Sequence, residues 1–468
     1  EELAHSVALE QGAEVTEVRL DHVLAERARS LPDGERALVE VLAVANNPIP
    51  RAVACRAAGL EDNVPRVLGA LHRAHFVQSA GVRAGDRVGI YHDRMRESVL
   101  AQLTSERTAA VHLALGRALA ALVDGNSPGP WLFDAVRHLG AAGSLLTDAH
   151  ERLAAARLHL SAGRQARQAA SFPLALRCFE DGVRLLPTDA WESDYETSLG
   201  LHAGAAEAAY LNAAWAVMDE RIAQVKAHSR SLVDQMPAWV VQIDALAGRH
   251  EYLAAIDAGL EVLALLGVHL PRDPDEASVG AAFGRALEDL TRVGPDGLAA
   301  LPDARDPHVL AAMRIQVRLC PVAFFAQQRL LALMACNLVT TSIEQGLSTA
   351  TPNALALFGL ILNSAGMFPV SHGWGQLAIT LLDRWEERSL EAATRHVVFN
   401  FVCPWIVPLR SVVASSRAVF ELAQRTGDFE YGSYAAHMAT YMALAAGQPL
   451  VPLRDDALWL GQQIRSFG

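Results

Sequence analysis

The chain has 468 residues, of which 51% are hydrophobic, so it is long enough and apolar enough to bury more than one core. Forty Lys and Arg residues against 52 Asp and Glu give a formal net charge of −12. This acidic balance argues against a broad nucleic-acid or anionic-membrane surface, because both need clustered positive charge. Lys226 is the only lysine, which excludes a P-loop and also excludes Schiff-base chemistry at any other lysine.

The cysteines are odd in number, widely scattered and never arranged as C-x-x-C; they are Cys55, Cys178, Cys320, Cys336 and Cys403. Neither a disulfide framework nor a Cys-rich zinc site is indicated, and we predict a reducing, cytoplasmic location. The chain begins EELAHSVALE, without an initiator Met, a basic segment or an apolar signal segment. We therefore expect it to be a fragment of a longer polypeptide.

One uncharged stretch, between Glu344 and Asp383, raises the question of a membrane span. Polar residues and prolines interrupt it, and ALALFGLIL is its longest clean apolar run. That run is far shorter than the ~20 residues that a spanning helix needs. We predict buried helices here, and no contact of the chain with a membrane.

Residues 21–104 are predicted to form a compact winged helix. Three short helices are expected first, in the segments GERALVEVLAVA (capped by Asp33), RAVACRAAGL and RVLGALHRAHF. A hairpin follows, with strands HFVQSA and DRVGIYH joined by GVRAG. The strand-like alternation then changes to helical spacing in GIYHDRMRESVLAQL, and the change falls on His92 and Asp93.

From residue 105 to the end, helical periodicity persists without a convincing strand. The segments ARQAASFPLALRCFEDGVRLLP and ALAGRHEYLAAIDAGLEVLALLGV each place a small residue three positions after an aromatic one, which lets paired helices approach. The spacing is irregular, so we predict a long α-solenoid of degenerate tetratricopeptide-like hairpins. Loops at 267–277 and 293–307 are expected to separate two lobes, residues 105–270 and 271–468.

Seven segments occur in a characteristic order: LPDGERALVEVLAVANNPIP, LHRAHFVQSAG, IYHDRMRESVLAQL, HLALGRALAA, FEDGVRLLP, GLEVLALLGVHLP and GDFEYGSYAAHMATYMALAAGQPL. Over essentially the whole chain they resemble bacterial multidomain signalling kinases, in which a STAND-type AAA ATPase precedes a winged helix and a tetratricopeptide-like region. The resemblance implies that residues 1–20 are the end of the ATPase lid. It also implies a serine/threonine or histidine kinase and bound ATP or ADP in the parent polypeptide, with no cofactor in this chain.

In STAND ATPases, the His of a His-Asp pair at the end of the winged helix contacts the β-phosphate of ADP in the closed state. His92 and Asp93 are the matching positions. A histidine there can donate an N–H to a phosphate oxygen, while Asp93 is expected to cap the following helix. In the alternative, His92 only satisfies backbone groups at the end of a strand. The missing ATPase domain is the partner that the resemblance implies.

Other kinds of site find less support in the sequence. The third helix of residues 21–104 would enter DNA, yet Arg66, His72 and Arg73 are its only basic side chains, so we predict domain packing and no nucleic-acid partner. The His-Asp pair also occurs in metal-dependent phosphohydrolases, but the further metal ligands are absent. No nucleophile framework is found. We predict no metal site and no catalytic residue in this chain.

The segment NFVCPWIVPL breaks an apolar, aromatic run with two prolines. It could line an effector pocket on the concave side of the repeats, with Trp405, Phe401 and Trp374 as candidate residues. In the alternative it is a buried kink between stacked helices, because Trp and Phe usually serve packing.

Three functions remain open from the sequence. The first is a regulatory and effector-sensing arm of an ATP-dependent signalling kinase, without chemistry of its own, whose repeats bind a protein or a small molecule. The second is the sensor arm of a STAND transcription activator, which requires a further helix-turn-helix. The third is a separate tetratricopeptide-like scaffold.

Overall fold

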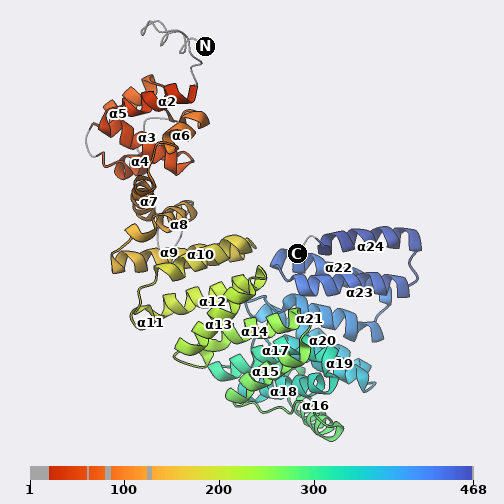
Figure 1. Cartoon of the computed structure of the whole chain (residues 1–468). Coiled ribbons are helices and arrows are strands. Elements are labelled where there is room, and N and C mark those ends of the chain that lie inside the picture. Colours follow the sequence, from red (N-terminus) through yellow and green to blue (C-terminus); the bar gives the residue numbers. More distant parts are fainter. Residues whose placement is uncertain (1–19, 61–62, 80–85, 124–128, 466–468) are drawn as a thin grey trace. The chain divides into compact units, whose positions relative to one another are not determined.

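The computed structural model describes residues 20–60, 63–79, 86–123 and 129–465. These residues are mainly helical, as predicted (Figure 1). Contacts divide the chain into two compact units, Glu1–Val217 and Met218–Gly468, and each is described by itself. Two predicted features lie outside the described residues: the lid helix, apart from Leu20, and the GVRAG turn.

The first unit begins with a domain of short helices and a small sheet. Its elements are α2 (Leu20–Arg29), α3 (Asp33–Ala45), β1 (Ile49–Pro50), α4 (Arg51–Ala57), α5 (Val64–Arg73), β2 (Val77–Ser79), β3 (Arg87–Ile90) and α6 (Asp93–Leu100). The sheet is antiparallel in the order β1-β3-β2, with Ile49 opposite Val88 and Val77 opposite Ile90. Its core includes side chains that are at most 2% exposed, namely Leu38, Leu42, Leu71, Phe76 and Val88.

The predicted helix caps are wrong by one position. Helix α3 starts at Asp33 after Pro32, and α6 starts at Asp93 after His92, so neither aspartate is the capping residue. Both carboxylates instead lie in the first turn, where they face the positive end of the helix dipole. The side-chain cap of α6 is His92 itself.

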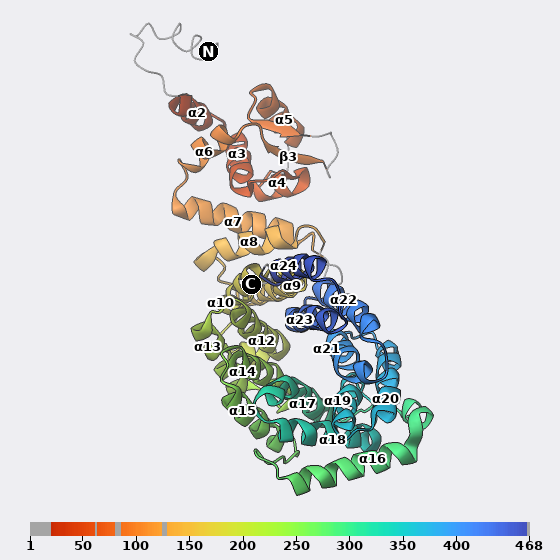
Figure 2. The ribbon, with the colours of Figure 1, turned by 90° about the vertical axis from the view of Figure 1, so that its right-hand side faces the viewer.

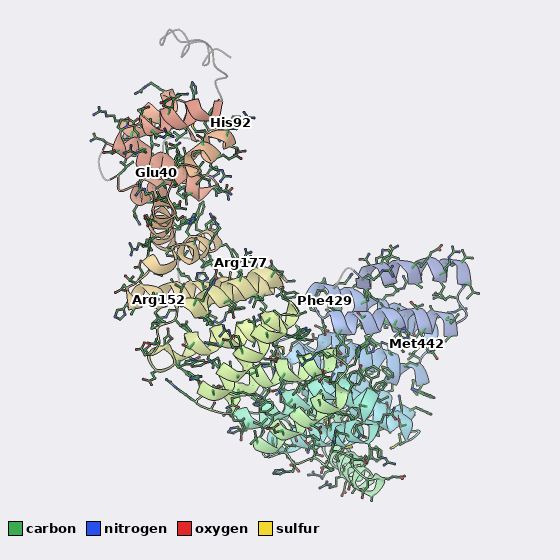
Figure 3. The ribbon with its side chains drawn as sticks, viewed as in Figure 1. Glu40, His92, Arg152, Arg177, Phe429 and Met442 are labelled. Carbon is green, nitrogen blue, oxygen red and sulfur yellow. The ribbon has the colours of Figure 1, made fainter. Side chains whose placement is uncertain are left out.

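The rest of the first unit consists of helices that pack on their neighbours in the chain. They are α7 (Ser105–Ala120), α8 (Leu132–Ala141), α9 (Ala149–Gln168), α10 (Phe172–Leu185), α11 (Ala190–Ser193) and α12 (Tyr195–Leu211), with a 3-10 turn at Gly143–Leu145. The expected hairpin segment ARQAASFPLALRCFEDGVRLLP is the end of α9 and the whole of α10. Arg152 in α9 donates to the carbonyl oxygens of Arg184 and Leu185, which helps to hold the end of α10 (Figure 3).

The second unit continues the helical pattern around one large core. Its elements are the remainder of α13 (Trp215–His228), α14 (Met236–Gly248), α15 (Tyr252–Leu265), α16 (Glu276–Ala299), α17 (Pro307–Ala326), α18 (Gln328–Gln345), α19 (Thr351–Ser364), α20 (Phe368–Leu381), α21 (Glu391–Val397), α22 (Leu409–Thr426), α23 (Phe429–Ala445) and α24 (Leu450–Arg465). Single 3-10 turns occur at Val233–Gln235 and Leu382–Arg384. Helices α14 to α23 follow one another in a curved layer (Figure 2).

The second predicted loop, residues 293–307, is partly helical. Residues 293–299 belong to α16, which bends at Gly294, where φ is 69°, and continues through Pro295. The bend is expected because glycine tolerates positive φ and proline cannot continue the hydrogen bonding of the preceding turn. A proline-containing sequence therefore produced a kink where a full loop was predicted.

The uncharged stretch between Glu344 and Asp383 forms α19 and α20, two helices of 14 residues each, joined by a turn. In the part of the chain that the structure describes, one helix, Pro307–Ala326, is long and apolar enough to cross a membrane, and 56% of its most apolar window is buried in the protein. Core helices of globular proteins satisfy the same criterion.

Candidate functional site

His92 lies at the surface, between the end of β3 and the start of α6 (Figure 3). Its backbone is extended, with φ −146° and ψ 138°, as is usual for a capping residue. Its Nδ1 lies 3.3 Å from the backbone nitrogen of Arg94 and accepts its N–H. A neutral imidazole that accepts through Nδ1 carries its proton on Nε2. The cap therefore leaves an exposed Nε2–H donor.

The chain before His92 is held by contacts that fix its direction. The backbone N–H of Tyr91 donates to the carbonyl oxygen of Phe76 at 3.0 Å, which extends the pairing of the hairpin. The Tyr91 ring, 53% exposed, meets the ring of His75 edge-on at 5.7 Å. On the other side, the carbonyl oxygen of His92 accepts from Met95 at 3.0 Å. The imidazole thus projects from backbone that is fixed on both sides.

The candidate DNA-reading helix is α5. Its Arg66 and Arg73 are exposed, whereas the His72 ring is half-buried, with Nδ1 2.7 Å from the carbonyl oxygen of Leu68. Within the residues that the structure covers, no group of three or more His, Cys, Asp and Glu side chains is placed to hold a metal ion.

The three candidate pocket residues have different surroundings. Trp405 is 59% exposed and stacks on Phe368, with ring centroids 4.8 Å apart. Phe401 is half-buried and lies edge-on to Phe324 at 5.9 Å. Trp374 belongs to the core of the second unit. The segment around Phe401 and Trp405 forms a π-helical turn, Val398–Val402, and a 3-10 turn, Cys403–Trp405, between α21 and α22.

A ring cluster beside this kink was missed from the sequence. His396 is 5% exposed and lies 5.7 to 5.9 Å from the rings of Phe401, Tyr431 and Tyr434. Burial lowers the pKa of His396 to about 4, so this imidazole is neutral at physiological pH. The rings of this cluster come from α21, the π-helical turn and α23. Helical periodicity within one segment does not reveal which side chains of separate segments come into contact.

Each unit has a hollow in its surface. In the first unit, a hollow of about 360 Å³ includes Arg29, Arg36 and Glu40. In the second unit, a hollow of about 280 Å³ includes Lys226 and Gln242, from α13 and α14. Neither contains a residue that the sequence singled out as a site.

Comparison with known proteins gives little information about the function of the chain. No protein-family description and no curated protein matches the chain. One solved structure to which the chain is similar is a STAND (Signal Transduction ATPase with Numerous Domains) protein with a tetratricopeptide repeat sensor, from Pyrococcus horikoshii. The alignment has 9% identity and a TM-score of 0.37, and it covers 97% of this chain and 66% of that one. A likeness at this TM-score carries no argument about function.

Proposed function

We propose that the chain is the regulatory and sensing arm of an ATP-dependent bacterial signalling protein, in which a STAND-type ATPase is coupled to a kinase. The observation that carries the proposal is the placement of His92. It is an exposed donor at a fixed strand-to-helix junction, at the end of a small domain that is followed by stacked helical hairpins. A chain built in this way can present the His92 imidazole to a neighbouring domain and the long surface of its helical hairpins to an effector.

Residues 21–104 are proposed to be a winged helix. The element order, with α3, β1, α4 and α5 followed by the β2–β3 hairpin, supports this assignment, as does the sheet order β1-β3-β2. The charge on α5 is thin for a helix that follows DNA phosphates. We therefore assign the domain to packing on the ATPase and not to DNA.

The proposed role of His92 is to donate its Nε2–H to a phosphate oxygen of ADP held by the ATPase domain. The Nδ1 contact to Arg94 fits this role, because it fixes the tautomer and the ring direction before the nucleotide is met. A donor that contacts the phosphate only in the closed arrangement favours that arrangement. Loss of the contact on nucleotide exchange would shift the population toward the open form, and the repeats would carry the change to the kinase.

The chain itself is proposed to be no enzyme, and its partners are the ATPase domain and an effector that binds the repeats. The full open reading frame around the chain distinguishes this proposal from two alternative functions. A kinase domain in that frame would support the signalling-kinase proposal, and a helix-turn-helix would support a transcription activator. A complete frame limited to these residues would instead support a scaffold.

The test is binding between residues 1–468 and the separately purified ATPase domain, loaded with ADP or with a non-hydrolysable ATP analogue. We expect tighter binding to the ADP form, and we expect His92→Asn to remove the preference. Equal binding to both forms by the unaltered chain would contradict the proposal. Calorimetry of the chain alone should detect no ATP binding.

A further inference from the structure

The only lysine of the chain borders the hollow between α13 and α14, here called the Lys226 groove. The groove belongs wholly to the second unit and has a volume of about 280 Å³. Its polar lining consists of Asp219, Lys226, Gln242 and Arg249, and its apolar lining consists of Met218, Ile222, Ala223 and Leu246. A groove with one amine and a run of apolar surface suits a ligand with one reactive end and an aliphatic remainder.

The amine of Lys226 is held in place on two sides. Its Nζ donates to Oε1 of Gln242 at 2.6 Å and lies 3.0 Å from the centre of the Trp239 ring. The Lys226 side chain is half-buried. Burial lowers the pKa of Lys226 to about 8, against the opposing charge of Glu261. At neutral pH such a lysine holds on the order of a hundred times more neutral amine than an ordinary lysine does.

A purely structural role explains this lysine less well. All Lys and Arg residues of the chain except Lys226 are arginines. Arginine forms cation–π contacts at least as readily as lysine does. Arg27 over Phe76 and Arg87 over Trp131 are examples in the first unit. What a lysine adds, and a guanidinium does not, is an amine that becomes a nucleophile when it loses its proton.

We propose that Lys226 captures an aliphatic aldehyde as a reversible imine, with the carbon chain of the aldehyde lying along Met218, Ile222 and Leu246. The lone pair of the neutral amine attacks the carbonyl carbon, the two N–H protons of the amine pass through solvent to the carbonyl oxygen, and that oxygen leaves as water. A C=N bond then joins Nζ to the former carbonyl carbon, and no oxidant or reductant is needed. The inference goes beyond the proposed switching and does not depend on it.

The test labels the full 468-residue chain with nonanal in the presence of cyanoborohydride, which reduces the imine to a stable amine. A variant with Arg410→Lys adds a second lysine at an exposed position of the same unit, so both amines compete within one molecule. Peptide mass spectrometry then gives the two rates. At pH 7, Lys226 should be labelled at least about tenfold faster than the lysine at position 410. Equal or slower labelling of Lys226 would overturn the proposal.

A second comparison tests the groove itself. Acetaldehyde has the same reactive group as nonanal but almost no chain, so Lys226 should prefer nonanal, and the exposed lysine at position 410 should show a smaller preference. Leu246→Gln, which makes the groove polar, should reduce labelling of Lys226 by nonanal several-fold and leave labelling by acetaldehyde unchanged. If Leu246→Gln slows neither reagent, or both equally, the groove does not bind the chain of the aldehyde. Because no nucleotide or ATPase domain is present, failure of the switching proposal would leave these results unaffected.

Discussion

Phe179 of α10 packs on the bare backbone of Gly204 in α12, where a β-carbon would lie 2.7 Å from Cε1 of the ring. Gly163 of α9 meets the same ring from another side and is at least as close. The ring is 1% exposed. Two glycines thus form a slot for one aromatic side chain, and this slot sets how closely α9, α10 and α12 approach one another.

Gly204→Ala should destabilise the first unit by about 1–3 kcal/mol, because the added methyl group overlaps the ring in a tightly packed site. Gly69→Ala is the matched control, since its β-carbon would meet only the end of the Arg73 side chain, at 3.6 Å. Because Gly69 lies in the middle of α5, Gly69→Ala should instead stabilise the first unit by about 0.5–1 kcal/mol through helix propensity. Denaturant unfolding followed by helical circular dichroism measures both. A Gly204→Ala variant as stable as Gly69→Ala would refute the slot.

Local sequence signals were sufficient to predict much of the secondary structure of the first domain. Helical spacing, Pro50 and Gly59 predicted its helices, and the change of period marked His92 at the correct junction. The strand Ile49–Pro50 was not predicted, because NNPIP has the composition of a turn. It pairs because the Ile49 side chain is buried and the N–H of Arg51 donates to the carbonyl oxygen of Asp86, neither of which a local pattern reveals.

The contacts of Lys226 could not be predicted from the sequence, for the same reason. Lys226 stood out as the only lysine, but its contact with Trp239 depends on how two helices meet. The ring cluster around His396 likewise joins Tyr431 from a helix more than 30 residues away. Periodicity identifies which face of a helix is buried, but not which neighbour covers that face.

His138 should make the first unit sensitive to acid. It is fully buried, with Nε2 2.9 Å from Arg137 and Nδ1 2.7 Å from Nδ1 of His112. Burial, aided by the charge of Arg137, lowers the pKa of His138 to about 3 from an ordinary 6.5. Below pH 6.5 the unfolded chain therefore binds a proton that the folded chain does not, and the free energy of unfolding falls until about pH 3.

The variant His138→Gln keeps a donor and an acceptor but cannot titrate in this range. We expect it to lose less stability than the unaltered chain between pH 6.5 and pH 3, by a few kcal/mol at most. His150→Gln, at an exposed position, should leave the pH dependence unchanged. Urea unfolding at a series of pH values gives the comparison. Parallel curves for His138→Gln and the unaltered chain would show that another group controls the acid response.

A direct titration of Lys226 is straightforward, because the chain has one lysine. Reductive methylation with ¹³C-formaldehyde and cyanoborohydride gives one lysine signal, and the pH dependence of its chemical shift reports the pKa of the amine. That pKa should be about 8, and Trp239→Ala should raise it toward the ordinary value of about 10.4 by admitting water. A signal in the unaltered chain that titrates like that of the exposed lysine in Arg410→Lys would contradict the burial.

The cap at His92 can be separated from its proposed phosphate contact. In the isolated chain, His92→Ala should cost about 0.5–2 kcal/mol of stability by removing the side chain that accepts from Arg94. His92→Asn should cost little, because asparagine is a good capping residue. Thermal unfolding of the two variants checks this difference. Equal losses would mean that the 3.3 Å contact contributes nothing to the helix start.

The rate of ADP release from the polypeptide that joins this chain to its ATPase domain tests the central claim most directly. The unaltered protein is compared with His92→Asn, which keeps the cap but lacks the Nε2–H at its position. Loss of a charge-assisted hydrogen bond worth ~1.5–3 kcal/mol should speed ADP release roughly 10- to 150-fold and raise basal kinase output. Release from His92→Asn at the unaltered rate would show that His92 only caps α6, and that the chain does not sense the nucleotide through it.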